Sequence, residues 1–178
     1  MLDDHGFEVY ETNPFPIAYL LTFRTYGSWL HGDERWSINR NVQDNFRSRA
    51  VPPNKPLHDA MAEELGQPPF LLDALQRTCV KEAIVEVCDN RGYLLRGVNV
   101  RSNHAHSVVS AAKKPEPIAN EFKAYATRRL RREFLVDSSN KIWSRGASTR
   151  YLWKPRHVEA AVDYVLYCQE DIPFEFQD

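Results

Sequence analysis

Two histidines separated by one residue, His104 and His106, are the first feature of this sequence that could do chemistry. They open a largely apolar run that is typical of a β-strand. Side chains alternate between the faces of a strand, so residues two apart project from the same face. Two imidazoles placed in that way suit one ion of Zn, Mn, Fe or Ni, whereas Mg²⁺ would need additional oxygen ligands. The alternative is a pair of partly exposed strand histidines that bind nothing.

Two tyrosines, Tyr164 and Tyr167, lie in the last apolar segment, 157–169, whose spacing predicts an amphipathic helix. A phenol beside a metal ion could attack a phosphate, because a divalent ion makes the phosphorus more electrophilic. It needs that help at neutral pH, since free tyrosine has a pKa near 10. Most helical tyrosines are packing residues instead, and the residues alone leave both interpretations open.

Basic side chains are concentrated in two stretches that could contact nucleic acid. The stretch 123–132 has no acidic residue and supplies Lys123, Arg128, Arg129 and Arg132. The stretch 143–154 supplies Arg145 and Arg150 and interleaves its cations with Trp143, Tyr151 and Trp153. Cations beside flat aromatic rings can hold backbone phosphates and stacked bases. The alternatives are a solvated helix face and strand aromatics that pack on the core.

The elements that must position these side chains follow from periodicity and turn residues. We expect a buried strand at Ala18–Arg24, a helix at 73–89 capped by Asp73, and a hairpin of strands 93–100 and 104–110. A helix at 116–134, short strands at 141–144 and 149–153, and the final helix complete the order. This order predicts an α+β fold, a ferredoxin-like antiparallel sheet with helices packed on it plus a C-terminal helix that carries the tyrosines.

The length and composition of the sequence limit the kinds of protein that this chain can be. The 178 residues fit one domain, 1–178, with a long irregular insertion at about 27–70 that contains a short helix at 57–65. A net charge of −1 argues against a general nucleic-acid coating protein but allows a local basic surface. The 3 cysteines form no CxxC pair, and Cys79 and Cys88 fit a buried helix face. Neither a membrane span nor a secretory signal is evident, so we expect a cytoplasmic protein without a membrane partner.

Taken in order, these segments resemble the single-tyrosine HUH transposases, and the branch they resemble is the REP-associated, insertion-sequence-200-like group. Residues 103–109, NHAHSVV, resemble the HUH motif, in which two metal-binding histidines flank a hydrophobic residue, usually after Asn. Residues 18–23, 122–130 and 142–146 resemble the first strand, the FKxYxxRR-like helix and the Trp-containing strand of that family. Residues 161–166, AVDYVL, resemble its final helix, and the resemblance covers roughly 17–170.

The resemblance implies a specific reaction. Tyr164 would attack single-stranded DNA and leave a 5′-phosphotyrosine and a free 3′-OH, while Mg²⁺ or Mn²⁺ held by His104 and His106 orients the phosphate. A second 3′-OH could then reverse the linkage and join strands. Members of the family bind DNA hairpins near the cleavage site and often form homodimers. No nucleotide cofactor is needed, because the covalent bond conserves the phosphodiester energy.

The sequence departs from the family at the third metal ligand. Members often carry Gln or Asn four residues after the tyrosine, but Cys168 occupies that position and Gln169 follows it. An offset of five residues turns about 140° around an ideal helix. Gln169 from a distorted helix end, a water or another residue could complete the metal site, and Tyr167 is the alternative nucleophile. Two other functions stay open, a non-catalytic protein that binds hairpin DNA or RNA and a phosphoesterase that uses water.

Overall fold

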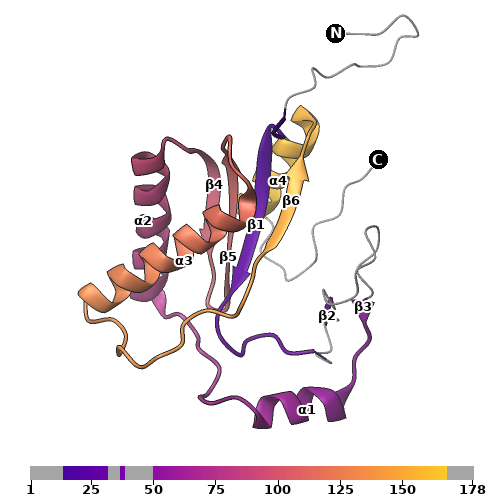
Figure 1. Ribbon diagram of the computed structural model, residues 1–178, viewed down its shortest axis with the longest axis vertical. Coiled ribbons are helices and arrows are strands. Elements are labelled where there is room, and N and C mark those ends of the chain that lie inside the picture. Colours follow the sequence, from indigo (N-terminus) through magenta and orange to yellow (C-terminus); the bar gives the residue numbers. More distant parts are fainter. Residues whose placement is uncertain (1–13, 32–36, 39–49, 168–178) are drawn as a thin grey trace, which may run out of the picture.

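The computed structural model of the chain describes residues 14–31, 37–38 and 50–167. A four-stranded antiparallel sheet in the order β4-β5-β1-β6 forms its centre (Figure 1). Its strands are β1 (Ala18–Arg24), β4 (Leu94–Val100), β5 (His104–Ser110) and β6 (Ser148–Leu152). The helices are α1 (Lys55–Glu63), α2 (Ala74–Arg91), α3 (Pro115–Arg132) and α4 (Pro155–Tyr167). A separate two-stranded sheet pairs β2 (Ser37–Ile38) with β3 (Ala50–Val51).

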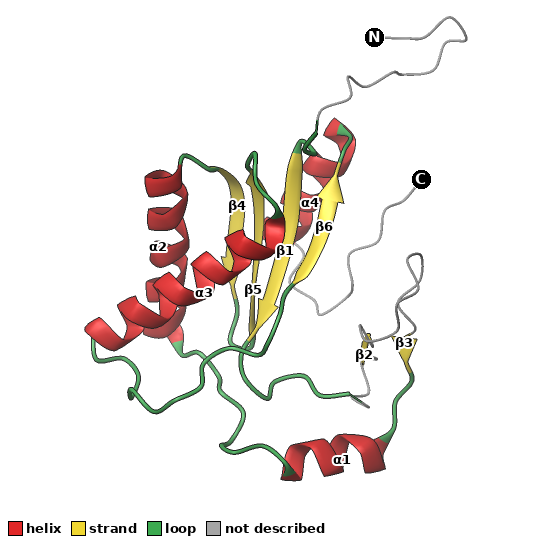
Figure 2. Cartoon of the chain, viewed as in Figure 1, coloured by secondary structure: helices red, strands yellow, loops and turns green. Residues whose placement is uncertain are grey.

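The connection of these elements confirms the predicted α+β, ferredoxin-like arrangement. Without the elements between β1 and α2, the chain runs β1-α2-β4-β5-α3-β6. Strand β5 pairs antiparallel with both β1 and β4, so β1 and β4 run in the same direction with β5 between them. Helices α2 and α3 cover one face of the sheet, and α4 covers the other (Figure 2). We call these the α2/α3 face and the α4 face.

The strongest sequence signals gave the most accurate boundaries. Both β1 and β5 have the predicted bounds, and β4 and β5 form the predicted antiparallel hairpin. The predicted cap of α2 is confirmed, since the side chain of Asp73 accepts a hydrogen bond from the backbone N–H of Gln76, whose side chain bonds back to the Asp73 N–H. The helix ends at Gly92, whose φ of 68° is readily adopted by glycine.

Three helices begin one or two residues earlier than predicted, and all three have proline in the first turn. Pro56 lies near the start of α1, and α3 and α4 begin at Pro115 and Pro155. Proline lacks an N–H, but the first N–H groups of a helix have no partner within the helix. Its fixed φ also suits a helix start, so these prolines belong inside the helices.

The predicted strand at 141–144 is wrong. This segment runs beside the end of β1, where the N–H of Tyr26 bonds to the carbonyl of Ile142 and the N–H of Ser144 bonds to that of Arg24. Only one bridge, between Thr25 and Trp143, has strand geometry. A turn at Gly146, with φ at 75°, then interrupts the pairing before β6 begins.

Each face of the sheet has its own apolar cluster. On the α2/α3 face, Tyr19, Leu21 and Phe23 of β1 pack with buried residues of both helices, Phe122 among them. The cluster on the α4 face is smaller and combines Leu20, Val108 and Leu152 of the sheet with Val158, Ala161 and Val165 of α4. Cys79 and Cys88 are buried as predicted, and burial raises their thiol pKa values to about 11 and about 12.

Both ends of the predicted insertion are tied to the sheet region. The N–H of Phe70 bonds to the carbonyl of Tyr26, and the side chain of Gln67 bonds to the backbone of Lys141. Gly27 has φ at 68°, and a Cβ there would lie 3.2 Å from the backbone Cα of Pro69, so both the turn and the close return of the chain favour glycine. Within the described parts of the chain, none of the helices combines the length and apolar character needed to cross a bilayer.

Candidate active site

The predicted histidine pair lies at the start of β5, on the α4 face. Its ring centroids are 4.5 Å apart, and His104 is only 5% exposed. Strand pairing places His106 between Thr22 of β1 and Asn99 of β4, and places His104 opposite Arg24. Directly paired residues share a face of the sheet. The histidines therefore belong to a polar row of side chains at one end of the α4 face.

Hydrogen bonds at Nδ1 orient both imidazole rings. His104 Nδ1 lies 2.6 Å from Asn103 Oδ1, and His106 Nδ1 lies 2.7 Å from Thr22 Oγ1. An amide oxygen can only accept, so the Nδ1 of His104 carries the hydrogen. Histidines that bind metals commonly donate their other ring N–H to an oxygen in this way. A metal ion on this pair would therefore be coordinated through Nε2.

The donor set fits a divalent metal ion but does not complete its coordination. Two oriented imidazoles suit a first-row divalent ion. In the described ranges 14–31, 37–38 and 50–167, no third His, Cys, Asp or Glu joins a ligand cluster. Further ligands would have to be amide, hydroxyl, water or substrate oxygens. The predicted ligand Gln169 lies outside the described residues, so its role stays a prediction.

A group of hydroxyls fixes the backbone of Asn103 and, through it, the side chain that orients His104. The carbonyl of Asn103 accepts bonds from the Thr25 N–H at 2.9 Å, the Thr25 hydroxyl at 3.1 Å and the Ser28 hydroxyl at 3.1 Å. The Ser144 hydroxyl donates in turn to the carbonyl of Thr25. Thr25 is fully buried in spite of its polar side chain. We call Thr25, Ser28 and Ser144 the hydroxyl clamp.

The structure brings Tyr164 against the histidine pair. Its ring centroid lies 5.3 Å from that of His106, with the ring planes at 70°. Val158, Ala161 and Val165 hold α4 on the sheet, and Tyr164 is half-buried on the same side of the helix. Tyr167 is 73% exposed, and no ring contact joins it to either histidine in the described structure. Tyr164 is therefore the tyrosine that the fold places at the site.

Asn99 ties the tyrosine helix to the histidine row. Its Nδ2 donates a 2.9 Å hydrogen bond to the carbonyl of Val165, which follows Tyr164 on α4. Asn99 also pairs with His106 across the sheet. Sequence reasoning missed Asn99, Thr22 and the hydroxyl clamp. The only available signals were isolated polar residues in strands and turns, and these do not identify a bonding partner.

Several predicted DNA-binding residues lie on the α2/α3 side, where they bond to other parts of the chain. Arg129 of α3 pairs with Glu82, Glu86 and Glu133. The Lys123 ammonium donates to the carbonyls of Ser144 and Gly146. The Trp143 indole donates to the carbonyl of Lys123 and packs at right angles on Phe23. These contacts give the three residues structural roles, and their predicted contact with DNA stays untested.

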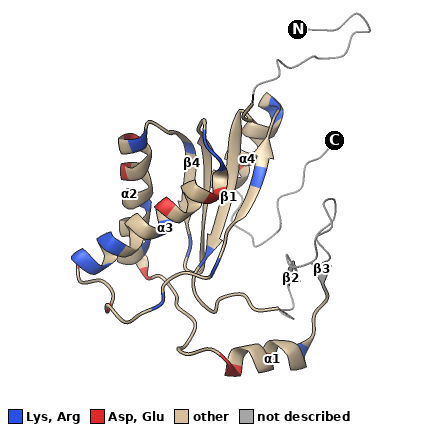
Figure 3. Ribbon diagram, viewed as in Figure 1, with Lys and Arg blue, Asp and Glu red and all other residues tan. Residues whose placement is uncertain are grey.

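The other predicted cations are distributed over the surface. Figure 3 shows basic residues at the C-terminal end of α3 and, separately, on β6. Arg128 stacks on Tyr125, with its guanidinium carbon 4.2 Å from the ring centroid, and Arg132 is exposed. Arg145 is exposed before β6. Arg150 pairs with Leu20 across the sheet. It therefore lies on the α4 face, the same face as the histidines.

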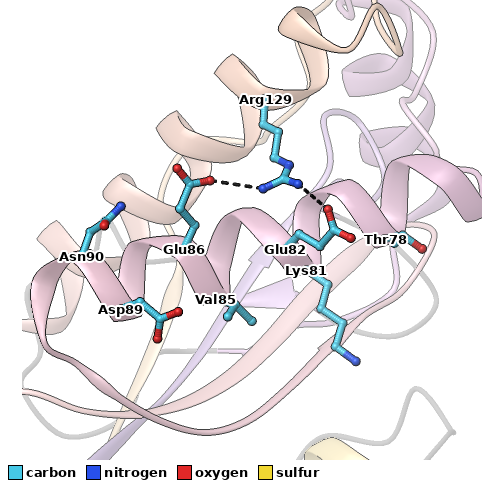
Figure 4. A pocket seen from close by; sticks show the side chains of 8 residues that line it. All are labelled: Thr78, Lys81, Glu82, Val85, Glu86, Asp89, Asn90 and Arg129. Atoms are coloured by element: carbon cyan, nitrogen blue, oxygen red, sulfur yellow. Dashed lines mark hydrogen bonds and ion pairs between the residues drawn. The ribbon is translucent and has the colours of Figure 1, made fainter.

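An open groove on the outer surface of α2 is not part of this site. Figure 4 shows Glu82 and Glu86 on α2 with Arg129 of α3 bonded to both. Asp89 adds a further acidic group, and Lys81 is the other basic residue of the lining. A predominantly acidic groove does not suit the phosphates of nucleic acid. The groove also lies on the side of the sheet opposite the histidines.

Comparison with known proteins identifies a family over more than half of the chain. Residues 70–165 match the family model described as "Transposase IS200 like". This range begins before α2 and ends within α4, so it includes both histidines and Tyr164. None of the curated proteins compared matches the chain. A solved structure described as "Structure of the REP associates tyrosine transposase bound to a REP hairpin" is similar at a TM-score of 0.48 and 13% identity, covering 89% of this chain and 69% of that one.

Proposed function

This chain belongs to the IS200-like transposase family, and from that membership we propose that it cleaves and rejoins single-stranded DNA beside hairpin sequences. Tyr164 is the proposed nucleophile, and His104 and His106 are the proposed ligands of Mg²⁺ or Mn²⁺. The observation that supports this most directly is the contact between the rings of His106 and Tyr164, 5.3 Å apart. These residues come from different elements, and the fold joins them on one face of the sheet.

The proposed reaction exchanges one phosphodiester for another. The Tyr164 oxygen forms a bond to phosphorus while the bond from phosphorus to the 3′ oxygen breaks. The phenol loses a proton and the departing 3′ oxygen gains one, so the products are a 5′-phosphotyrosine and a 3′-OH. Attack by a 3′-OH on the phosphotyrosine reverses these changes and joins strands. No nucleotide is consumed, because the number of phosphodiester bonds is unchanged.

The residues of the site divide this work. His104 and His106 would hold the metal ion, which when bound supplies a positive charge that polarises the scissile phosphate. Asn103 and Thr22 fix the imidazole rings through Nδ1. Asn99 holds the turn of α4 that carries Tyr164. Positioning of this kind contributes to rate because the reacting groups no longer need to find each other.

The test is the formation of a covalent adduct. The protein is incubated with Mn²⁺ and a labelled pool of hairpin-flanked single strands with randomised flanks, and the products are separated on a denaturing gel. We expect an adduct with the unaltered protein, none with Tyr164→Phe, and a reduced amount with His106→Ala. Tyr167→Phe is the matched control, because it removes the same hydroxyl from an exposed position on the same helix.

Each competing function predicts a different result. A non-catalytic hairpin-binding protein would bind the pool without cutting it. A phosphoesterase that uses water would still cleave after Tyr164→Phe and would form no adduct. An adduct that is lost in Tyr167→Phe and kept in Tyr164→Phe would assign the nucleophile to Tyr167. The proposal also includes a homodimer, which light scattering of the purified protein measures directly.

A further inference from the structure

Two exposed aromatic rings stand side by side at the end of the edge strand β6. Tyr151 and Trp153 are two residues apart, so they project from the same side of the strand. Their ring centroids are 6.4 Å apart and their planes differ by 19°. Tyr151 is 42% exposed and Trp153 is 49% exposed. We call this pair the aromatic ladder.

The tyrosine of the ladder rests on the core. Tyr151 pairs with Tyr19 of β1, and their rings meet edge to face at 5.1 Å and 86°. Tyr19 is buried in the cluster of the α2/α3 face. A ring supported in this way keeps its orientation, so little conformational entropy is lost when a ligand stacks on it.

The charge around the ladder favours an anionic ligand. Along the chain the ladder is flanked by basic residues, since Arg150 precedes Tyr151 and Lys154 and Arg156 follow Trp153, while the carboxylate of Glu116 acts on Tyr151 from α3. Another exposed aromatic residue, Phe134, also follows basic residues at the end of α3, but in the described parts of the chain it stacks on no second ring. Flat rings combined with cations are the usual means of holding single-stranded nucleic acid without reading its sequence.

The ladder also lies within reach of the candidate active site. Strand β6 begins at Ser148, which pairs with Thr22, the partner of His106. Three residues of strand, about 10 Å, separate Ser148 from Tyr151. The histidines occupy the α4 face and the ladder the other side, but β6 is an edge strand. A DNA strand that passes around this edge can therefore contact both.

We propose that Tyr151 and Trp153 form a stacking site for unpaired bases of the DNA strand, next to the cleavage site. The proposal rests on the proposed function, because it assumes that the substrate is single-stranded DNA. The bases stack on the exposed rings, and the neighbouring Arg150, Lys154 and Arg156 neutralise the flanking phosphates. Such a site tolerates any sequence, since every base has a flat face.

The test compares an intact strand with one that lacks bases. Fluorescently labelled oligothymidine and the same oligomer with abasic residues are titrated with the full chain in EDTA, which prevents cleavage. We expect Tyr151→Leu and Trp153→Leu each to bind the intact strand at least 5-fold more weakly, and neither to bind the abasic strand more weakly than the unaltered protein does. Trp153→Phe retains a flat ring and should recover most of the affinity. The salt dependence of binding should stay unchanged, because no phosphate contact is removed.

Phe134→Leu is the matched control, because it removes an exposed aromatic ring, 93% accessible, that also has basic neighbours in the sequence but belongs to no stacked pair in the described structure. Thermal unfolding of each variant separates lost binding from lost fold. Equal affinity of the Leu variants and the unaltered protein for intact DNA would overturn the stacking site. So would equal affinity of the unaltered protein for intact and abasic strands, or a change of oligomeric state in place of a change in affinity. Adduct formation by the same preparation would still support the proposed function in each of these cases.

Discussion

The two faces of the sheet are built differently, although they share the same strands. The α2/α3 face has a large apolar cluster, and some of its charged groups pair with each other, as Arg129 does with Glu82 and Glu86. The α4 face has a small apolar cluster at one end and a polar row at the other. Hydrogen bonds in that row are directed at the imidazoles of His104 and His106.

This difference indicates that the α2/α3 face mainly stabilises the fold, whereas the α4 face mainly positions the candidate active site. Burying polar groups near a reaction centre reduces the apolar area that a face can contribute to folding. A single helix on the α4 face then suffices to position Tyr164, provided that the α2/α3 face supplies most of the stability. Substitutions that affect one face at a time test whether the two faces differ in this way.

The largest expected effect comes from two neighbouring leucines of β1 that point to opposite faces. Leu21 is buried in the cluster of the α2/α3 face and Leu20 in that of the α4 face. We expect Leu21→Ala to lower the free energy of unfolding by about 3–5 kcal/mol and Leu20→Ala by about 2–3 kcal/mol. Urea unfolding of both variants measures the difference. A larger loss from Leu20→Ala would contradict the claim that the α2/α3 face supplies most of the stability.

The next effect separates chemistry from stability. Thr22→Val keeps the shape of the side chain but removes the hydroxyl bonded to His106 Nδ1. Under the proposed function, Mn²⁺ affinity or the rate of adduct formation should fall about 10- to 100-fold, as it does when metal-bound histidines lose their outer partners. The control is Thr149→Val on β6, which pairs with Leu21 and so faces the other side. Equal effects of the two changes would argue against an orienting role for Thr22.

A smaller effect is expected from the ion-pair network of the α2/α3 face. Arg129→Met should lower the free energy of unfolding by about 1–2 kcal/mol, because three carboxylates lose their shared partner, and 1 M salt should reduce this loss. The exposed Arg132, whose contact with Glu133 is 3.8 Å long, serves as the control. We expect Arg132→Met to change stability by less than about 0.5 kcal/mol. Equal stability of the two variants would show that the network contributes nothing measurable.

The smallest effect is a pH dependence on the same face. Burial alone would raise the pKa of Glu121, but hydrogen bonds from Lys113 and Tyr93 and the charges of Lys113 and Arg91 lower it below its ordinary value of 4.5. A lowered carboxyl pKa stabilises the fold above pH 4.5, and this stability is lost as pH falls through the lowered value. The stability difference between the unaltered protein and Glu121→Gln should therefore shrink below pH 4.5. The urea midpoints of both proteins at pH 7 and pH 3 measure this difference. Glu63→Gln on α1 is the control. A stability difference that does not depend on pH would contradict the lowered pKa of Glu121.

Local patterns in the sequence were sufficient for most of the fold. The apolar run of β1, the hairpin of β4 and β5 and the Asp73 cap each depend on residues close together in the chain, so they could be predicted. The predicted starts of α1, α3 and α4 were one or two residues late, because a proline in a sequence can indicate either the end of a helix or its first turn. The prediction of a strand at 141–144 was wrong because the apolar residues of this segment pack beside β1 without continuous pairing.

The site was less predictable because its contacts join distant segments. The spacing of His104 and His106 placed both on one face, and the family pattern selected Tyr164. Nothing in the sequence indicated that Thr22 would bond to His106 or that Asn99 would bond to the helix of Tyr164. Such hydrogen bonds depend on which strands become neighbours, and that is decided by the whole fold.

The central place of β1 has a consequence for the order in which this protein becomes active during synthesis. Strand β1 leaves the ribosome first among the elements of the large sheet, yet its two neighbours are β5 and β6. Its second edge stays uncovered until Leu152 has emerged, and α4 follows only then. A nascent chain therefore carries its histidine pair well before its tyrosine can reach it. Under the proposed function, an unfinished polypeptide could bind a metal ion but could not cut DNA.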